Sequence, residues 1–316
     1  MKSVFFIGEC MVELQRGSSA ANASLSGAMT DTMQYRFGGD TLNTAVYFSR
    51  LTDHALFDPT YVSALGSDTL SCEMQAMWQR EGINTQWVQC LPDKLPGMYL
   101  IETDAGGERH FHFWRNDSAA RYWLQSPGTP AVCAALAKAD AIYLSGISLA
   151  ILSPQDRQEL CKVLADCRQH GGKIIFDNNY RPLLWQNPAF AKQAYQQVLQ
   201  LADIALLTLD DENLLYGTAT AEEAIARTSA LGVKEIVIKR GAQSCLVSID
   251  GMQHEIAPLR VTTVVDTTAA GDSFGAAYIA ARLSGKNAVD AASAGHRLAS
   301  VVIQHRGAII PQYAMP

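Results

Sequence analysis

The sequence predicts an α/β fold in which helices cover both faces of a mostly parallel central sheet. The first observation is that short apolar runs are separated by longer stretches of helical pattern, which is typical of strands buried on both faces. These runs occupy residues 3–8, 141–146, 173–179, 204–209 and 235–241. The second observation is that two other segments do not fit this alternation. They predict a small β-rich layer over one end of the sheet.

Helices are predicted between these strands, over residues 153–170, 188–201 and 221–231. The first of them carries signals at both ends. Ser153 followed by Pro154 is typical of an N-cap with proline at the first helical position, and Gly171-Gly172 fits the matching stop.

The segments outside the alternation are 97–116 and the early region that contains residues 18–30. The first reads "GMYLIETDAGGERHFHFWRN", two alternating runs around "DAGG", which predicts a β-hairpin. Residues 18–30 are small and polar enough for a long loop. Ligands of doubly wound sheets bind beyond the carboxyl ends of the strands, and a lid placed there would shield the chemistry from water. We expect a lid formed by about 11–37 and 86–116.

The length and net charge of the chain limit the number of domains and the kinds of binding partner that we expect. The 316 residues allow one large α/β domain or two smaller ones. The net charge of -6, from 25 basic and 31 acidic side chains, argues against broad attachment to nucleic acid or to an anionic membrane. No stretch approaches the roughly 20 apolar residues that span a bilayer. We therefore expect no nucleic-acid or membrane partner.

The N-terminus and the cysteines favour a cytoplasmic protein. "MKSVFFIGECMVEL" contains a short apolar run, but Glu9 and Glu13 interrupt it, so it is interpreted as a first strand and not as a signal peptide. The seven cysteines are widely scattered, and none forms a C-x-x-C pair, which favours reduced thiols over a disulfide framework or a zinc site.

The stretch "DTTAAGDSF", residues 266–274, is the sharpest candidate for chemistry. Its small residues allow a tight turn, and a helix beginning near Ala270 would point unpaired N–H groups and its positive dipole end at an anion. Asp272 would lie in the first turn, where its carboxylate could accept a proton from a hydroxyl. The alternative is that Asp272 only complements the charge of the helix N-terminus.

A second glycine-containing turn is "FGGDTLNTAVYFSRL", residues 37–51. Gly38 and Gly39 would let a small polyhydroxylated ligand approach the backbone, while Asp40 and Asn43 can form hydrogen bonds with its hydroxyls. The alternative is an ordinary loop with Asp40 as the N-cap.

Both motifs resemble the signatures of the ribokinase-like (PfkB) sugar kinases. "GGDTLNTA" is similar to the motif that shapes the sugar site, and "DTTAAGDSF" to the motif that carries the anion hole and the catalytic aspartate. The resemblance runs from "IGECMVEL" to "RGAIIP". It implies a single domain, 1–316, built as a three-layer αβα sandwich with a small β-sheet lid, and a nucleotide-binding part at about 175–316. It also implies MgATP, a monovalent cation such as K⁺ as a further candidate, and a homo-oligomer, with a dimer preferred.

Within this family the sequence is most similar to bacterial 2-keto-3-deoxygluconate kinases. The segments that carry this likeness are "GGDTLNTAVY", "LPGMYLIETDAGGERHFHFWRN", "YLSGISLAIL", "FDNNYRPLLW" and "VIKRGAQSCLV". The implied reaction is ATP-dependent phosphorylation of the terminal C6 hydroxyl. Kinases of another sugar acid, such as 2-keto-3-deoxygalactonate, or of a ketohexose are the alternatives. A non-catalytic binding protein would not need Asp272, and a dinucleotide oxidoreductase would need the G-x-G-x-x-G that is missing after the first strand.

The resemblance assigns a role to each candidate residue. Asp272 is the general base, and the backbone of Ala269, Ala270, Gly271 and Asp272 is the anion hole. The expected sugar contacts are Gly38, Gly39, Asp40, Asn43, Tyr99, Phe113, Trp114, Arg115, Arg181 and Asp272. The expected ATP contacts are Asn179, Arg181, Thr208, Lys239, Gly241, Ala269 and Gly271.

Two details of these assignments depend on this chain's own residues. A sugar acid carries a carboxylate, and the guanidinium groups of Arg115 and Arg181 suit it. "TLDD", residues 208–211, stands where many family members have N-x-x-E, so Asp211 is the candidate for binding magnesium through water.

Ala269 occupies a position where family members commonly have glycine. We expect the turn there to tolerate a Cβ, with negative φ at Ala269.

Overall fold

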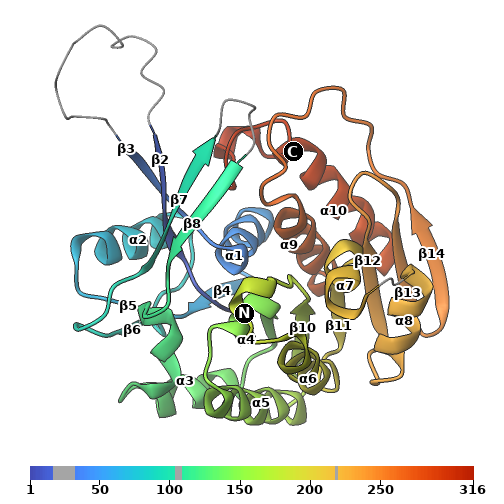
Figure 1. The fold of residues 1–316 in the computed structure, drawn as a ribbon. Coiled ribbons are helices and arrows are strands. Elements are labelled where there is room, and N and C mark those ends of the chain that lie inside the picture. Colours follow the sequence, from blue (N-terminus) through green and yellow to red (C-terminus); the bar gives the residue numbers. More distant parts are fainter. Residues whose placement is uncertain (17–32, 104–108, 218–219) are drawn as a thin grey trace, which may run out of the picture.

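The large sheet forms the centre of the molecule (Figure 1). The computed structural model describes residues 1–16, 33–103, 109–217 and 220–316. In this part of the chain the sheet has eight strands in the order β14-β13-β12-β11-β10-β9-β1-β4. Neighbouring strands from β12 to β4 pair in parallel, and β13 and β14 are antiparallel. The strands are β1 (Lys2–Ile7), β4 (Phe57–Val62), β9 (Ala141–Ser145), β10 (Lys173–Asp177), β11 (Ile204–Thr208), β12 (Glu235–Lys239), β13 (Cys245–Ile249) and β14 (Met252–Ile256). The predicted α/β fold and all five predicted strands are confirmed.

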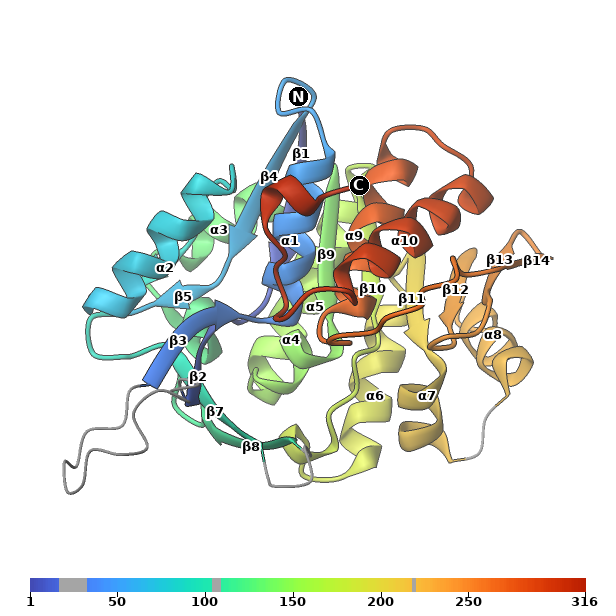
Figure 2. The ribbon, with the colours of Figure 1, turned by 90° about the horizontal axis from the view of Figure 1, so that it is seen from above.

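Helices cover both faces of this sheet, and each face has its own apolar core (Figure 2). One core joins the sheet to α3 (Thr129–Leu136), α4 (Gly146–Ala150), α5 (Pro154–Gln169), α6 (Pro188–Leu199), α7 (Leu209–Tyr216) and α8 (Ala221–Ser229). The other joins it to α1 (Asp40–Leu51), α2 (Thr69–Arg80), α9 (Ala270–Leu283) and α10 (Ala288–Val302). Short 3-10 helices occupy Ala119–Gln125, Pro182–Leu184 and Gln312–Ala314.

The signals at the ends of α5 act as predicted. The side chain of Ser153 accepts a hydrogen bond from the backbone N–H of Asp156, and Pro154 is the first helical residue. Gly171 has φ 90°, a left-handed conformation that glycine adopts without steric strain and that ends the helix.

A small, separate sheet lies beside one end of the large one (Figures 1 and 2). Its order is β3-β2-β7-β8, with β2 (Met11–Arg16), β3 (Met33–Gly38), β7 (Gly97–Thr103) and β8 (Arg109–Trp114). β7 and β8 are antiparallel, as the alternating pattern predicted. The predicted loop at 18–30 and the "DAGG" turn lie outside the described residues. A third sheet pairs β5 (Ala64–Leu65) with β6 (Gln89–Cys90).

Candidate functional site

A cavity of about 490 Å³ lies where the carboxyl ends of the parallel strands meet the small sheet and the N-termini of α1 and α9. Parallel sheets place ligands at this edge. Most residues predicted from the two glycine-containing motifs line it. The predicted residues along its wall are Gly38, Gly39, Asp40, Asn43, Tyr99, Phe113, Asn179, Arg181, Thr208, Asp211, Lys239, Ala269, Ala270, Gly271 and Asp272.

The turn before α9 differs from its prediction. Ala269 is the N-cap of α9 and has φ 60° and ψ 16°, so the expected negative φ is wrong. The tight turn places Ala269 in the left-handed region, where a Cβ is crowded by the following carbonyl oxygen. The backbone at the anion site is therefore locally strained, and alanine, with the smallest Cβ-bearing side chain, occupies it.

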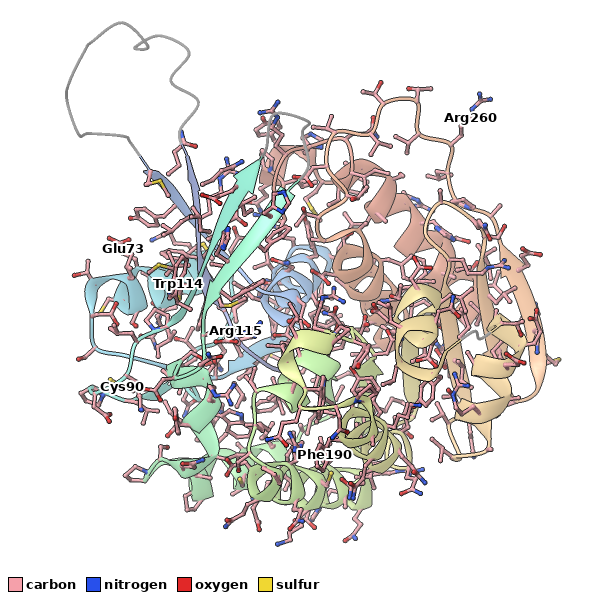
Figure 3. All side chains as sticks on the ribbon, in the orientation of Figure 1. Glu73, Cys90, Trp114, Arg115, Phe190 and Arg260 are labelled. Carbon is pink, nitrogen blue, oxygen red and sulfur yellow. The ribbon has the colours of Figure 1, made fainter. Side chains whose placement is uncertain are left out.

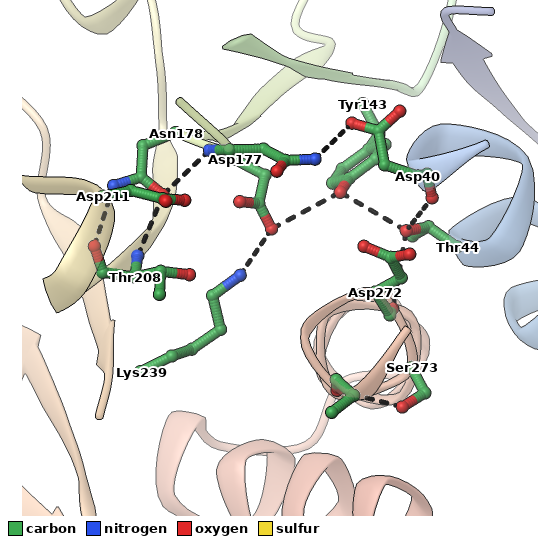
Figure 4. A network of polar contacts seen from close by, with 12 residues as sticks. Asp40, Thr44, Tyr143, Asp177, Asn178, Thr208, Asp211, Lys239, Asp272 and Ser273 are labelled. Carbon is green, nitrogen blue, oxygen red and sulfur yellow. Dashed lines mark hydrogen bonds and ion pairs between the residues drawn. The ribbon is translucent and has the colours of Figure 1, made fainter. Parts of the chain in front are cut away.

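Asp272 lies in the first turn of α9, and its side chain is directed toward α1 (Figure 4). Asn43 donates a hydrogen bond of 2.8 Å to Asp272 Oδ2. Burial, together with the negative charge of Asp40, raises the pKa of Asp272 to about 7, although the hydrogen bond from Asn43 acts in the opposite direction. A carboxyl with this pKa is suited to take a proton near neutral pH.

Asp40 and Asn179 connect the first glycine motif to the large sheet. Asn179 donates to Asp40 Oδ2 at 2.6 Å, which joins the N-terminus of α1 to the residues after β10. Gly39 is the N-cap of α1, and an added Cβ there would meet the backbone carbonyl of Glu9. Only glycine fits this close approach, which brings Asp40 to the cavity.

Asp177 is a cavity residue that the sequence did not single out. Lys239 Nζ lies 2.6 Å from Asp177 Oδ2, and both side chains are almost completely buried. Burial raises the pKa of Asp177, and Lys239 opposes that shift. Tyr143 donates to Asp177 Oδ2 at 3.5 Å and accepts from Thr44 Oγ1 at 3.3 Å (Figure 4). The ammonium group of Lys239 is thus fixed between β10 and β12.

Arg181 and Asp211, which both line the cavity, form an ion pair. Arg181 Nη1 lies 3.3 Å from Asp211 Oδ1, and the backbone N–H of Tyr180 donates to Asp211 Oδ2 at 3.3 Å. Burial raises the pKa of Asp211, and Arg181 opposes that shift. Among the described residues there is no group of three or more His, Cys, Asp or Glu side chains arranged to hold a metal ion.

A second cavity, of about 150 Å³, adjoins the first. Thr208, Lys239, Ala270 and Gly271 line both. The predicted ATP contact Gly241 lines only this second cavity, together with Arg240, Cys245, Phe274, His296 and Ala299. Its mostly apolar lining suits a flat ring better than a phosphate.

The small sheet supplies the aromatic wall of the larger cavity. Tyr99 lines it and donates a hydrogen bond of 2.5 Å to Glu13 Oε2. The rings of Phe111 and Phe113 stack with centroids 6.3 Å apart and are 49% and 46% exposed. Half-exposed aromatic rings on a cavity wall provide apolar surface for a ligand to cover.

Trp114 is the last residue of β8 and Arg115 follows it (Figure 3). Neither residue lines the cavity. Trp114 is 58% exposed. The guanidinium of Arg115 is buried in an ion pair with the carboxylate of Glu9, which is also buried. This arrangement brings neither side chain to the cavity. The sugar contacts predicted for Trp114 and Arg115 stay predictions.

Several residues that line the cavity were not predicted, because the sequence around them contains no strong motif. Besides Asp177 they are Met11, Phe111, Ile147, Asp210, Thr267, Thr268 and Ala308. Asp177 ends an apolar strand immediately before Asn178 and Asn179, so its place at the carboxyl end of that strand was the available signal.

Comparison with known proteins points to one family. The model of the pfkB family of carbohydrate kinases matches residues 1–314. The chain is 54% identical over 318 residues to a 2-dehydro-3-deoxygluconokinase of Dickeya dadantii (strain 3937) and 51% identical over 319 residues to one of Escherichia coli (strain K12). Each alignment covers 100% of this chain and 99% of the relative.

Solved structures share the fold at lower identity. A putative ribokinase II from E. coli, in complex with ATP and Mg²⁺, has a TM-score of 0.81 at 24% identity, covering 100% of this chain and 96% of the other. A 2-dehydro-3-deoxygluconokinase from Thermotoga maritima has a TM-score of 0.80 at 19% identity, covering 98% of this chain and 94% of the other.

None of the helices in the described ranges has the length and apolar character needed to cross a lipid bilayer.

Proposed function

Because the chain belongs to the pfkB family of carbohydrate kinases, we propose that it catalyses the reaction for which its relatives are named, the ATP-dependent phosphorylation of 2-dehydro-3-deoxygluconate (2-keto-3-deoxygluconate). The product carries the phosphate on the terminal C6 oxygen. The observation that carries the mechanism is the partly buried carboxyl of Asp272, with a pKa of about 7, at the N-terminus of α9. Relatives that are 51–54% identical along the whole chain support the choice of sugar acid.

Asp272 acts as the general base. Its carboxylate takes the proton of the C6 hydroxyl as that oxygen attacks the γ-phosphorus, and the bond between this phosphorus and the ADP oxygen breaks. Phosphoryl transfer depends on positioning and on neutralising charge more than on covalent chemistry. Asn43 fixes the Asp272 carboxylate by a hydrogen bond to Oδ2 and leaves Oδ1 to accept the proton.

Backbone N–H groups of the turn at 269–272, other than that of Ala270, stabilise the charge on the transferred phosphoryl group. The N–H of Ala270 already donates to the carbonyl of Thr267 at 3.2 Å. The N–H groups of Ala269, Gly271 and Asp272 are therefore the candidates for the anion hole, reinforced by the dipole of α9.

The two ends of the cavity bind different parts of the reactants. Gly38, Gly39, Asp40, Tyr99 and Phe113 are the sugar contacts. Asn179, Arg181 and Lys239 lie toward the phosphates, and the second cavity, with Gly241, holds the base of ATP. The place of the base is supported by Gly241, which lines only the second cavity, and by Lys239, which lines both cavities.

Magnesium enters with ATP. The carboxylates of Asp177, Asp210 and Asp211 line the cavity, and oxygen ligands are those that magnesium prefers. They fit an ion that is held mostly by phosphate oxygens and water, with Asp211 contributing through a water molecule. We also propose that a K⁺ ion binds beside the anion hole, that the enzyme is a homodimer and that it is located in the cytoplasm.

A substrate panel tests the choice of sugar. ADP release should be fastest with 2-keto-3-deoxygluconate, compared with 2-keto-3-deoxygalactonate, other aldonic acids and neutral ketohexoses. A preference for a neutral ketose would overturn the assignment of a sugar acid.

The Asp272→Asn variant tests the mechanism. We expect kcat to fall by about 10²–10⁴-fold, the usual contribution of a general base, with little change in either KM. Asp290→Asn is the matched control because Asp290 is the third residue of α10, as Asp272 is of α9, but lies outside the cavity. Turnover by Asp272→Asn at the parental rate would contradict the general-base role.

A further inference from the structure

The carboxylate of the sugar acid needs a cation in the site, and the two cations predicted to bind it, Arg115 and Arg181, already form ion pairs with other residues. The inference drawn below about Arg36 rests on the proposed function. Arg115 is buried against Glu9, and Arg181 is held by Asp211 at the phosphate side of the cavity. Removing Arg115 from Glu9 would leave a buried carboxylate without its partner, which is strongly unfavourable.

Arg36, on β3, lies on the face of the small sheet that is directed at the cavity. In register, Arg36 is opposite Glu13, Glu13 is opposite Tyr99, and Tyr99 is opposite Phe113. Residues opposite each other on neighbouring strands share one face of a sheet. Tyr99 and Phe113 line the cavity, so the side chain of Arg36 belongs to the same row at its outer end.

A second contact places the Arg36 guanidinium beside a segment of the cavity wall, although Arg36 is not itself one of the residues that line the cavity. An added Cβ at Gly307 would lie 2.7 Å from Arg36 Nη1, so the guanidinium packs directly against the backbone of that residue. The next residue, Ala308, lines the cavity. The Arg36 guanidinium therefore lies between the small sheet and the segment that contains Ala308.

Among the described residues, no ion pair neutralises Arg36. Its cross-strand neighbour Glu13 accepts the hydrogen bond of Tyr99 instead. Arg36 is exposed, so its planar fork of N–H donors can meet a carboxylate in a bidentate arrangement.

We propose that Arg36 binds the carboxylate of the sugar acid and determines the preference of the enzyme for an acid over a neutral sugar. The carboxylate then lies at the small-sheet rim of the cavity, and the opposite end of the sugar chain reaches Asp272. Glu13 and Tyr99 hold each other and leave Arg36 to the substrate.

Steady-state kinetics of Arg36→Ala tests this proposal. With 2-keto-3-deoxygluconate we expect the sugar KM to rise by about 10- to 100-fold, the range for a lost charge-assisted hydrogen bond, with the KM for ATP within about two-fold of the parent. Arg36→Lys should recover part of the affinity, since it keeps the charge but loses the fork. With a neutral ketohexose, Arg36→Ala should keep the parental kcat/KM.

Two control variants distinguish the loss of this guanidinium from a general loss of surface charge or a disturbance of β3. Arg80→Ala removes the same charge from the exposed end of α2, and Tyr35→Phe changes the opposite face of β3, where Tyr35 donates to Glu73. Both should keep the parental sugar KM. A sugar KM unchanged in Arg36→Ala, or an equal loss with acid and neutral sugars, would overturn the role of Arg36. A parent enzyme inactive on the sugar acid would instead overturn the proposed function.

Discussion

Asp272 has an ordinary side chain in an unusual setting. Burial and the charge of Asp40 raise its pKa to about 7, well above the usual range of an aspartate. Below this pKa the folded enzyme carries a protonated carboxyl that cannot accept the hydroxyl proton. We expect kcat/KM for the sugar to fall as the pH decreases through about 7, and a pH–rate profile of the parent enzyme would show this limb.

Asp40→Asn tests the cause of that pKa. Removing the negative charge of Asp40 favours the ionised form of Asp272, so the acid limb of kcat/KM should move to lower pH. Asp290→Asn, which removes a carboxylate outside the cavity, should leave the limb in place. An acid limb at the same pH in Asp40→Asn and the parent would show that the charge of Asp40 does not set the pKa of Asp272.

At the scale of elements, the turn before α9 stores strain at Ala269. Glycine has no Cβ to crowd the carbonyl at φ 60°, so Ala269→Gly should raise the free energy of unfolding by about 1 kcal/mol. Ala270→Gly is the matched control, because Ala270 is the first helical residue of α9 and gains nothing from glycine. Chemical denaturation of both variants checks this. A loss of stability in Ala269→Gly would rule out relief of strain.

The strand β10 and the strand β12 are linked across β11 by Asp177 and Lys239. Asp177→Asn should leave Lys239 free to move away from the phosphates, so we expect the KM for ATP to rise by about ten-fold or more. Binding of the sugar alone, measured by calorimetry, should stay at the parental affinity. Equal losses for both substrates would indicate a general structural role for Asp177.

What the sequence could predict at these two scales depends on how local the signal is. Apolar runs and glycine motifs are local, and they predicted the five strands, the start of α9 and most of the cavity wall. The φ of Ala269 depends on how the whole turn closes onto α9. The pairing of Lys239 with Asp177 depends on strands 62 residues apart in the chain. The burial of Arg115 against Glu9 depends on how the small sheet joins the large one.

At the scale of the whole molecule, the small sheet is attached to the large one through a buried ion pair. Glu9 follows β1 and Arg115 follows β8, and both side chains are almost fully buried. Breaking a buried pair leaves one charge without its partner, which costs about 3–5 kcal/mol. The Glu9–Arg115 pair therefore fixes the base of the small sheet, and movement relative to the large sheet is expected in its outer part.

We predict that the outer part of the small sheet closes over the reactants when they bind. Phe111 and Phe113 face the cavity and are about half exposed, so a bound sugar can bury apolar surface if the outer parts of β7 and β8 move toward it. We expect backbone hydrogen exchange in both strands to slow when the sugar acid and a non-hydrolysable ATP analogue are bound together. The helix α5, which packs on the large sheet away from the cavity, should exchange at the same rate with and without them. Unchanged exchange in β7 and β8 would show that the small sheet is a fixed wall and that water is excluded by the substrates alone.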